Sequence, residues 1–284
     1  MIHKEISLNP EVPDVKLVTY LLSPSREVKV GEKKPAVIVC PGGAYQFLSD
    51  KEGEPIALKY NGEGFHSFVF RYHVGTDEYT KQPQPIIDLA KAILIIKQHA
   101  DEWEVDPDKI SICGFSAGGH LCAMYSSLWK DKWLCKTCGC KSEDLKISAA
   151  VLAYPMADYV LVETMRRKSP TNLMDQVNTV MTGTKDPDMD IIEKCSPLSY
   201  VNKNTVPCFI WHTFQDELLD VRNSLHFAEK LSEYQVPFEL HVYEEGRHGL
   251  ALACEATDCE KQEKERTAVE WFQDMIGFLR RGRA

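Results

Sequence analysis

A sharp turn between a strand and a helix constrains this chain more than any other feature. Residues 110–113 alternate in apolar character and are partly β-branched, as in a buried strand, and residues 121–128 favour a helix. Between them lies the G-x-S-x-G motif Gly114-Phe115-Ser116-Ala117-Gly118. In that context the motif predicts a nucleophile elbow, in which the glycines leave room for the turn and the serine exposes its hydroxyl from a strained backbone. We therefore expect Ser116 to be a nucleophile rather than an ordinary turn residue.

Strand patterns alternate with helical patterns along the rest of the chain. The strand patterns cover residues 2–8, 15–22, 36–40, 67–72, 110–113, 148–155, 206–213 and 238–243, and the helical patterns cover residues 52–60, 84–100, 121–128, 222–234 and 262–280. Such alternation builds a mostly parallel sheet with helices on both faces. The 284 residues suffice for one large domain. We predict an α/β fold with an eight-stranded sheet, opened by an antiparallel pair, in a single domain over residues 1–284.

Two segments break this alternation. Residues 156–199 are rich in Met, Lys, Asp and Pro, and they lie between two strands that one crossover helix would connect. They predict a small cap of short helices over the site, which sets substrate choice more than chemistry. Residues 130–144 are interpreted as a loop that adds to the same wall.

A serine hydroxyl needs a base within hydrogen-bond reach and an acid that orients the base. On a sheet of this kind the partners follow in the order Ser, Asp or Glu, His, each after the end of a strand. Ser116, Asp216 and His248 occur in that order and in those positions. We predict that these three residues form a catalytic triad.

Each partner has rivals nearby. Glu217 and Asp220 compete with Asp216, and Asp220 also has the position of a helix cap. His212 and His241 compete with His248, but both fall inside predicted strands, where structural roles are expected.

The oxyanion donors are expected at the elbow and after another central strand. The strand at residues 36–40 is followed by Gly42, Gly43 and Ala44, where paired glycines let backbone amides approach a ligand closely. The predicted donors are the amide of Ala117 and those of one or both of Gly43 and Ala44.

Charge and composition exclude several classes of partner. The net charge is −9 and the basic residues are scattered, which argues against nucleic acid and anionic membranes as partners. The first residues run directly into a strand pattern without an apolar segment, so we expect no secretory signal, no membrane span and a cytoplasmic location. The sequence leaves a homodimer open.

Three of the ten cysteines invite a metal interpretation. Cys135, Cys138 and Cys140 lie close together, but a zinc site needs a fourth ligand and usually a second pair of ligands. We expect reduced thiols and no metal here.

The motifs together resemble one superfamily. Cys40-Pro41-Gly42-Gly43-Ala44-Tyr45, the elbow through His120, Trp211-His212-Thr213 with Asp216, and Gly246-Arg247-His248-Gly249-Leu250 are similar to motifs of the α/β-hydrolase superfamily. Within it they resemble small acetyl esterases, acetylxylan esterases and "xylanase B-like" proteins. Lipase-type relatives carry His before the loop glycines, whereas Cys40-Pro41 stands there in this chain and favours the sugar-ester branch.

This resemblance implies a serine carboxylesterase that needs no cofactor and removes short acyl groups, acetyl above all, from small esters, with carbohydrate esters expected first. A peptidase of the same fold and a non-catalytic binding protein are the alternatives. Peptidases of this kind usually carry a large additional domain, for which the chain has no room, and the intact Ser, Asp and His argue against loss of catalysis. A glycosidase needs two carboxylates that flank a cleft, and the adjacent Glu244 and Glu245 are weak support for one.

Overall fold

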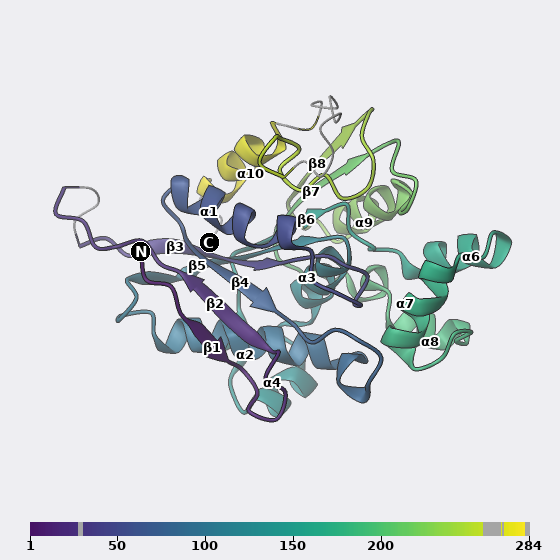
Figure 1. Cartoon of the computed structure of the whole chain (residues 1–284), viewed down its shortest axis with the longest axis horizontal. Coiled ribbons are helices and arrows are strands. Elements are labelled where there is room, and N and C mark those ends of the chain that lie inside the picture. The colour runs from purple at the N-terminus through teal and green to yellow at the C-terminus, as the bar shows by residue number, and fades with distance from the viewer. Residues whose placement is uncertain (28–30, 258–267, 269, 282–284) are drawn as a thin grey trace.

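A single eight-stranded sheet forms the centre of the described structure (Figure 1). The computed structural model describes residues 1–27, 31–257, 268 and 270–281. The strands are β1 (Glu5–Ser7), β2 (Lys16–Tyr20), β3 (Lys34–Cys40), β4 (His66–Arg71), β5 (Val105–Phe115), β6 (Ala149–Ala153), β7 (Cys208–Thr213) and β8 (Phe238–Tyr243). Their order is β1-β2-β4-β3-β5-β6-β7-β8, with β1 and β2 antiparallel to their neighbours and the others parallel. The predicted mostly parallel sheet, opened by an antiparallel pair, is confirmed.

Helices cover both faces of the sheet. One face carries α1 (Glu54–Gly62) and α10 (Trp271–Arg280), and the other carries α2 (Gln84–Gln98), α3 (Ala117–Leu128) and α9 (Arg222–Glu233) (Figure 1). The shorter elements are α4 (Lys132–Cys138), α5 (Ser142–Leu145), α6 (Tyr159–Lys168), α7 (Asn172–Thr182) and α8 (Met189–Lys194), with 3₁₀ turns η1 (Asp50–Glu52), η2 (Glu78–Thr80) and η3 (Pro197–Tyr200). Of the predicted helix at 262–280, residues 262–267 and 269 lie outside the described residues.

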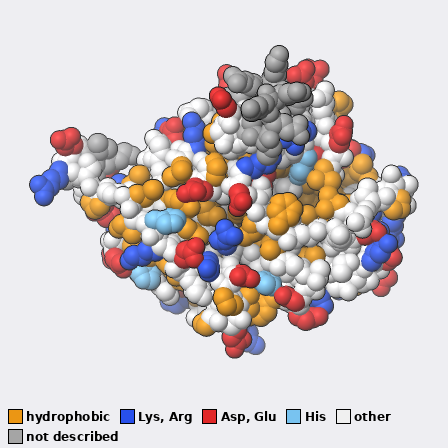
Figure 2. Space-filling view, viewed as in Figure 1, with side chains coloured by type: hydrophobic (Ala, Val, Ile, Leu, Met, Phe, Trp, Pro, Cys, Tyr) orange, Lys and Arg blue, Asp and Glu red, His pale blue; other side chains and the backbone are white. Residues whose placement is uncertain are grey.

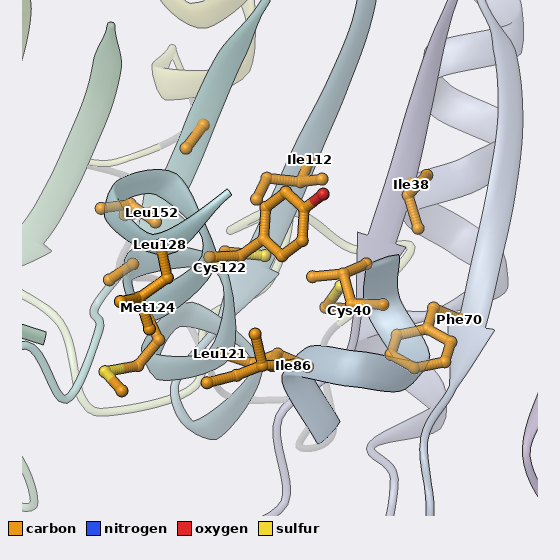
Figure 3. Close-up of a cluster of buried hydrophobic side chains, with 14 of the residues drawn as sticks. Ile38, Cys40, Phe70, Ile86, Ile112, Leu121, Cys122, Met124, Leu128 and Leu152 are labelled. Carbon is orange, nitrogen blue, oxygen red and sulfur yellow. The ribbon is translucent and has the colours of Figure 1, made fainter. Parts of the chain in front are cut away.

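The central strands are apolar throughout because both of their faces are buried. In β3, Val37 and Val39 pack in the cluster that includes α1 and α10. Ile38 and Cys40, which point the other way, pack with Leu121 of α3 in the cluster beneath α2 (Figure 3). The period-2 alternation of a strand thus fills two separate cores.

The interpretation of residues 130–144 as a loop was wrong. They form α4 and α5, which contact α2, and Leu134 and Leu145 are fully buried there. Each helix buries only one leucine and is too short for a 3.6-residue period to show in the sequence. None of these residues lines the pocket beside Ser116.

The connection between β6 and β7 contains α6, α7, α8 and η3, and its helices lie at one end of the molecule (Figure 1). On the face shown in Figure 2, acidic and basic side chains are interspersed, and no basic patch gathers there. No helix in the described part of the chain is both long and apolar enough to cross a bilayer.

Candidate active site

Ser116 lies at the turn between β5 and α3 in a left-handed conformation, with φ 51° and ψ −113°. The two motif glycines are required by close backbone contacts. A β-carbon on Gly114 would lie 2.1 Å from the carbonyl oxygen of Gly118, and one on Gly118 would lie 2.0 Å from the carbonyl oxygen of Cys40. The backbone strain at Ser116 persists only because the surrounding structure holds it. The close packing around Gly114 and Gly118 leaves no room for a larger residue at either position. The local geometry is that of the predicted elbow.

The structure brings Ser116, His248 and Asp216 into one hydrogen-bonded chain. His248 Nε2 lies 2.8 Å from Ser116 Oγ, and His248 Nδ1 lies 2.7 Å from Asp216 Oδ2. An ionised carboxylate only accepts hydrogen bonds, so the ring proton is on Nδ1. Nε2 is then free to accept the serine proton.

Asp216 is buried and accepts hydrogen bonds from several sides. His248 and His212 donate to Oδ2, and the amides of Leu218 and Leu219 donate to Oδ1. Burial alone would raise the pKa of Asp216, but the bonds from His212 and His248 hold it well below its usual value. The carboxylate is therefore charged throughout the physiological range.

His212 belongs to this site as a partner of the acid rather than as a rival base. Its Nε2 faces two acceptors, Asp216 Oδ2 at 3.1 Å and the carbonyl oxygen of Leu219 at 2.9 Å, so Nε2 carries the proton. Its Nδ1 is 2.8 Å from the hydroxyl of Ser224. The sequence placed His212 at the end of a strand but gave no sign of this contact.

The other rivals lie away from Ser116. Asp220 pairs with Arg222 and accepts its backbone amide, as a residue at a helix start does. Glu217 is exposed. His241, in β8, lies 3.7 Å from both Glu239 and Asp274.

The loop after β3 closes against the elbow. Gly43 has φ 126°, and a β-carbon there would lie 2.0 Å from the carbonyl oxygen of Phe47. Ala44 follows with φ 56° and lines the pocket next to Ser116 and Ala117. Neither the Ala44 amide nor the Ala117 amide has an acceptor among the described residues. The Gly43 amide likewise has no acceptor among the described residues, and of the three predicted donors Ala117 and Ala44 line the pocket.

The pocket beside Ser116 is small and apolar. It has a volume of about 30 Å³. Besides Ser116 and Ala117, its walls include Ala44, Met156, Leu173, Met174, Val177 and Leu219. Leu173, Met174 and Val177 come from α7, so the connection between β6 and β7 forms one wall of the pocket.

Tyr45, which also lines the pocket, is tied to the nucleophile helix. Its hydroxyl is 2.7 Å from His120 Nδ1, and His120 Nε2 is 2.7 Å from the carbonyl oxygen of Cys195. Since Nε2 faces a carbonyl, it carries the proton, and Tyr45 donates to Nδ1. Burial lowers the pKa of His120 to about 4, so this ring is neutral.

A buried carboxylate that sequence reasoning missed adjoins both loops. Glu52 Oε2 accepts the amide of Gly42 at 2.8 Å, and Oε1 accepts the hydroxyl of Tyr154 at 2.7 Å. The ring of Tyr154 meets that of His248 edge-on, with centroids 5.0 Å apart. Nothing in the sequence distinguishes Glu52 from the exposed charges around it.

The cysteine cluster lies away from this site. Cys135 and Cys138 are on α4, and Cys140 follows its end. Within the described residues, no three His, Cys, Asp or Glu side chains gather as metal ligands. Cys259 lies outside the described residues.

The strand order, the elbow and the hydrogen-bonded Ser–His–Asp chain define an α/β-hydrolase. Residues 25–231 match the BD-FAE family, and residues 192–281 match the dienelactone hydrolase family. The first match extends over most of the sequence, so this chain belongs to the BD-FAE family.

Curated relatives include endo-1,4-β-xylanase B of Butyrivibrio fibrisolvens, 30% identical over 78% of this chain and 33% of that protein. They also include an acetylxylan esterase of Xylanibacter ruminicola, 26% identical over 76% of this chain and 41% of that protein. The chain spans about a third to a half of the length of these relatives.

Similar solved structures cover nearly the whole chain. The carboxylesterase Cest-2923 from Lactobacillus plantarum is 26% identical, with a TM-score of 0.82 over 98% of this chain and 97% of that chain. An acetyl ester-xyloside bifunctional hydrolase from Caldicellulosiruptor lactoaceticus is 29% identical, with a TM-score of 0.73 over 97% of each chain.

Proposed function

We propose that this chain is a serine carboxylesterase that removes short acyl groups, acetyl above all, from small carbohydrate esters. The observation that carries the proposal is the continuous chain of hydrogen bonds from Ser116 Oγ through His248 to Asp216. The ester hydrolases among the similar proteins support the same reaction class.

In the proposed reaction, Ser116 Oγ attacks the ester carbonyl while His248 Nε2 takes the hydroxyl proton. The amides of Ala117 and Ala44 bind the oxyanion that forms. Collapse of this intermediate breaks the bond to the alcohol, which leaves with the proton from His248. Water then attacks the acyl-enzyme with the same base, which releases the acid and restores Ser116. Asp216 keeps the imidazole oriented and stabilises its positive charge.

Preference for a short acyl group follows from the size of the pocket. A cavity must offer roughly 10–15 Å³ to hold one water molecule. The volume of about 30 Å³ beside Ser116 therefore fits the methyl of an acetyl group and favours it over a long chain. We propose that residues 156–199 act as the cap, because α7 from this segment supplies the pocket wall.

A sugar as the alcohol is supported by the relatives rather than by a contact in this chain. Two of the similar proteins are an acetylxylan esterase and an acetyl ester-xyloside bifunctional hydrolase, so both are linked to acetyl esters and to xylan or xylosides. The proposal extends that class of substrate to this chain.

The test is hydrolysis of p-nitrophenyl acetate, butyrate and octanoate, with acetylated xylo-oligosaccharides alongside. Wild type should prefer acetate and release acetic acid from the oligosaccharides. Ser116→Ala should lose about 10⁴-fold or more of the activity while it retains the fold. Equal activity of wild type and variant would reject Ser116 as the nucleophile, and activity on p-nitrophenyl esters alone would reject the sugar assignment.

A further inference from the structure

Glu52 is a buried carboxylate without a cationic partner. Its side chain lies in η1, next to the site, and the residue is only 3% exposed. No Lys, Arg or His among the described residues forms an ion pair with it. A buried charge is costly unless hydrogen bonds replace the lost water. The hydrogen bonds of Glu52 must therefore offset the cost of its burial, and the groups that donate them indicate its role.

Both of its oxygens accept hydrogen bonds from groups of the active site. Gly42 N–H donates to Oε2, and Tyr154 O–H donates to Oε1. The Tyr154 oxygen in turn accepts the amide of Ala251 at 3.0 Å, so its own proton is committed to Glu52. Two donors thus converge on Glu52, and only a carboxylate accepts both.

One end of this network fixes the loop that presents the amide of Ala44. The carbonyl of Gly42 accepts the amide of Ser49, and that of Gly43 accepts the amide of Gln46, which closes a compact turn. Glu52 holds the first peptide of that turn. Gly42 also lies against the elbow, since a β-carbon on it would be 3.0 Å from Ser116 Cβ.

The other end fixes the chain just after His248. Ala251 and Ala253 both have positive φ, 51° each, so this segment is held in a strained path. Tyr154 binds the amide of Ala251 and touches the imidazole of His248 with its ring. The backbone of Tyr154 is itself left-handed, with φ 38°.

We propose that Glu52 is a positioning residue that fixes the oxyanion loop and the His248 loop relative to each other through Gly42 and Tyr154. The inference rests on the serine esterase chemistry proposed above. In the transition state the donors bind the developing oxyanion while His248 takes the proton of Ser116, so the distance between the two loops matters most there.

Glu52→Gln is the direct test. Its amide oxygen still accepts one hydrogen bond, but its NH₂ group then faces a second donor, so one bond is lost. We expect kcat for p-nitrophenyl acetate to fall about 100-fold, as for the loss of one oxyanion donor, with KM within about threefold of wild type. Glu54→Gln, two residues away at an exposed position, is the matched control and should leave both constants unchanged.

Amide hydrogen exchange gives a readout that needs no substrate. Glu52→Gln should speed exchange in residues 41–49 and 249–253. Tyr154→Phe, which removes only the hydroxyl, should speed it in 249–253 alone. Because both changes interrupt one network, kcat of the double variant should be within about threefold of that of Glu52→Gln.

The outcomes separate this inference from the proposed function. Wild type that hydrolyses no ester defeats the esterase proposal, and the exchange data still decide whether Glu52 fixes the two loops. Wild-type kcat in Glu52→Gln, or unchanged exchange in both segments, overturns the inference. A kcat loss that only parallels loss of folded protein, measured by thermal melting, also overturns it.

Discussion

The loops that carry the site and the connection between β6 and β7 are stabilised in different ways. Ser116, Asp216 and His248 follow β5, β7 and β8, and they are held by strained backbone, buried strands and hydrogen bonds of fixed direction. The connection, residues 156–199, packs Tyr159, Val177 and Met181 into the core and is held in addition by a network of ion pairs around one arginine.

Arg166 of α6 forms the centre of that network. It is 6% exposed and binds Glu163 through two nitrogens, Asp175 of α7, and Asp186 beyond α7. Asn178 of α7 also donates to Glu163. This network adds to the apolar packing of Val162 on α6 and of Val180 and Met181 on α7.

This difference separates chemistry from selectivity. The ion pairs tie α6 to α7, and α7 presents Met174 and Val177 to the pocket. We therefore expect substitutions in residues 156–199 to alter the pocket wall and to leave the strands that carry the triad in place. Substitutions among the triad residues should do the opposite.

The largest effect is expected from Asp216→Asn. The asparagine amide cannot accept from His248, His212, Leu218 and Leu219 together, and it favours the wrong imidazole tautomer. We expect kcat for p-nitrophenyl acetate to fall about 10⁴-fold while the preference for acetate over butyrate is unchanged. Steady-state kinetics on both esters checks this.

Asp220→Asn is the control for that variant. Asp220 bonds to Arg222 outside the triad, so its loss should change kcat less than about threefold. Equal losses in the two variants would leave the acid unassigned between them and contradict the triad described here.

Met174→Ala is expected to change the selectivity between acyl groups about tenfold and to leave the catalytic step unaffected. Shortening this side chain enlarges the pocket, and each methylene that an acyl pocket accepts is worth roughly 10-fold or more in specificity. We expect the butyrate-to-acetate ratio of kcat/KM to rise about 10-fold. Met165→Ala, in the same segment but 40% exposed, should leave the ratio unchanged. An unchanged ratio in both variants would remove α7 from the acyl site.

The loops at the strand ends could be predicted from the sequence because each buried strand has a short apolar pattern that recurs along the chain. A run such as residues 36–40 has no polar face, which identifies a central strand. Once the strands are identified, their parallel order places their carboxyl ends at one edge of the sheet. From that placement we predicted that Ser116, Asp216 and His248 lie together. The start of β5 at Val105 was missed because Asp106 and Pro107 are typical of a turn.

The features that could not be predicted from the sequence depend on burial and on contacts that exist only in the folded chain. Glu52 lies among the charges of Asp50-Lys51-Glu52, and only the fold shows that it alone is buried. His212 was expected to be structural, and its bond to Asp216 depends on how the chain turns after β7. Short helices such as α4 and α5 bury too few residues to reveal a period.

The smallest expected effect concerns stability against pH in residues 156–199. Burial of Glu163 acts to raise its pKa, but hydrogen bonds from Arg166, Asn178 and Arg167 lower it from 4.5 to about 2. A carboxyl whose pKa is lower in the folded state stabilises that state above its unfolded pKa. This contribution is lost as the pH falls from about 4.5 to 2.

Glu163→Gln removes that contribution and should lower the melting temperature by about 3–6 °C at pH 7. Carboxyls outside the Arg166 network titrate alike in both proteins, so the gap between wild type and variant reports on Glu163 and the carboxyls that share Arg166 with it. Thermal melts from pH 7 to pH 3 should show this gap shrinking below pH 4.5. Glu193→Gln, exposed on α8, should show no such gap. A gap that stays constant with pH would mean that the ion pairs around Arg166 do not depend on the charge of Glu163, and the contrast between the two regions would lose its electrostatic basis.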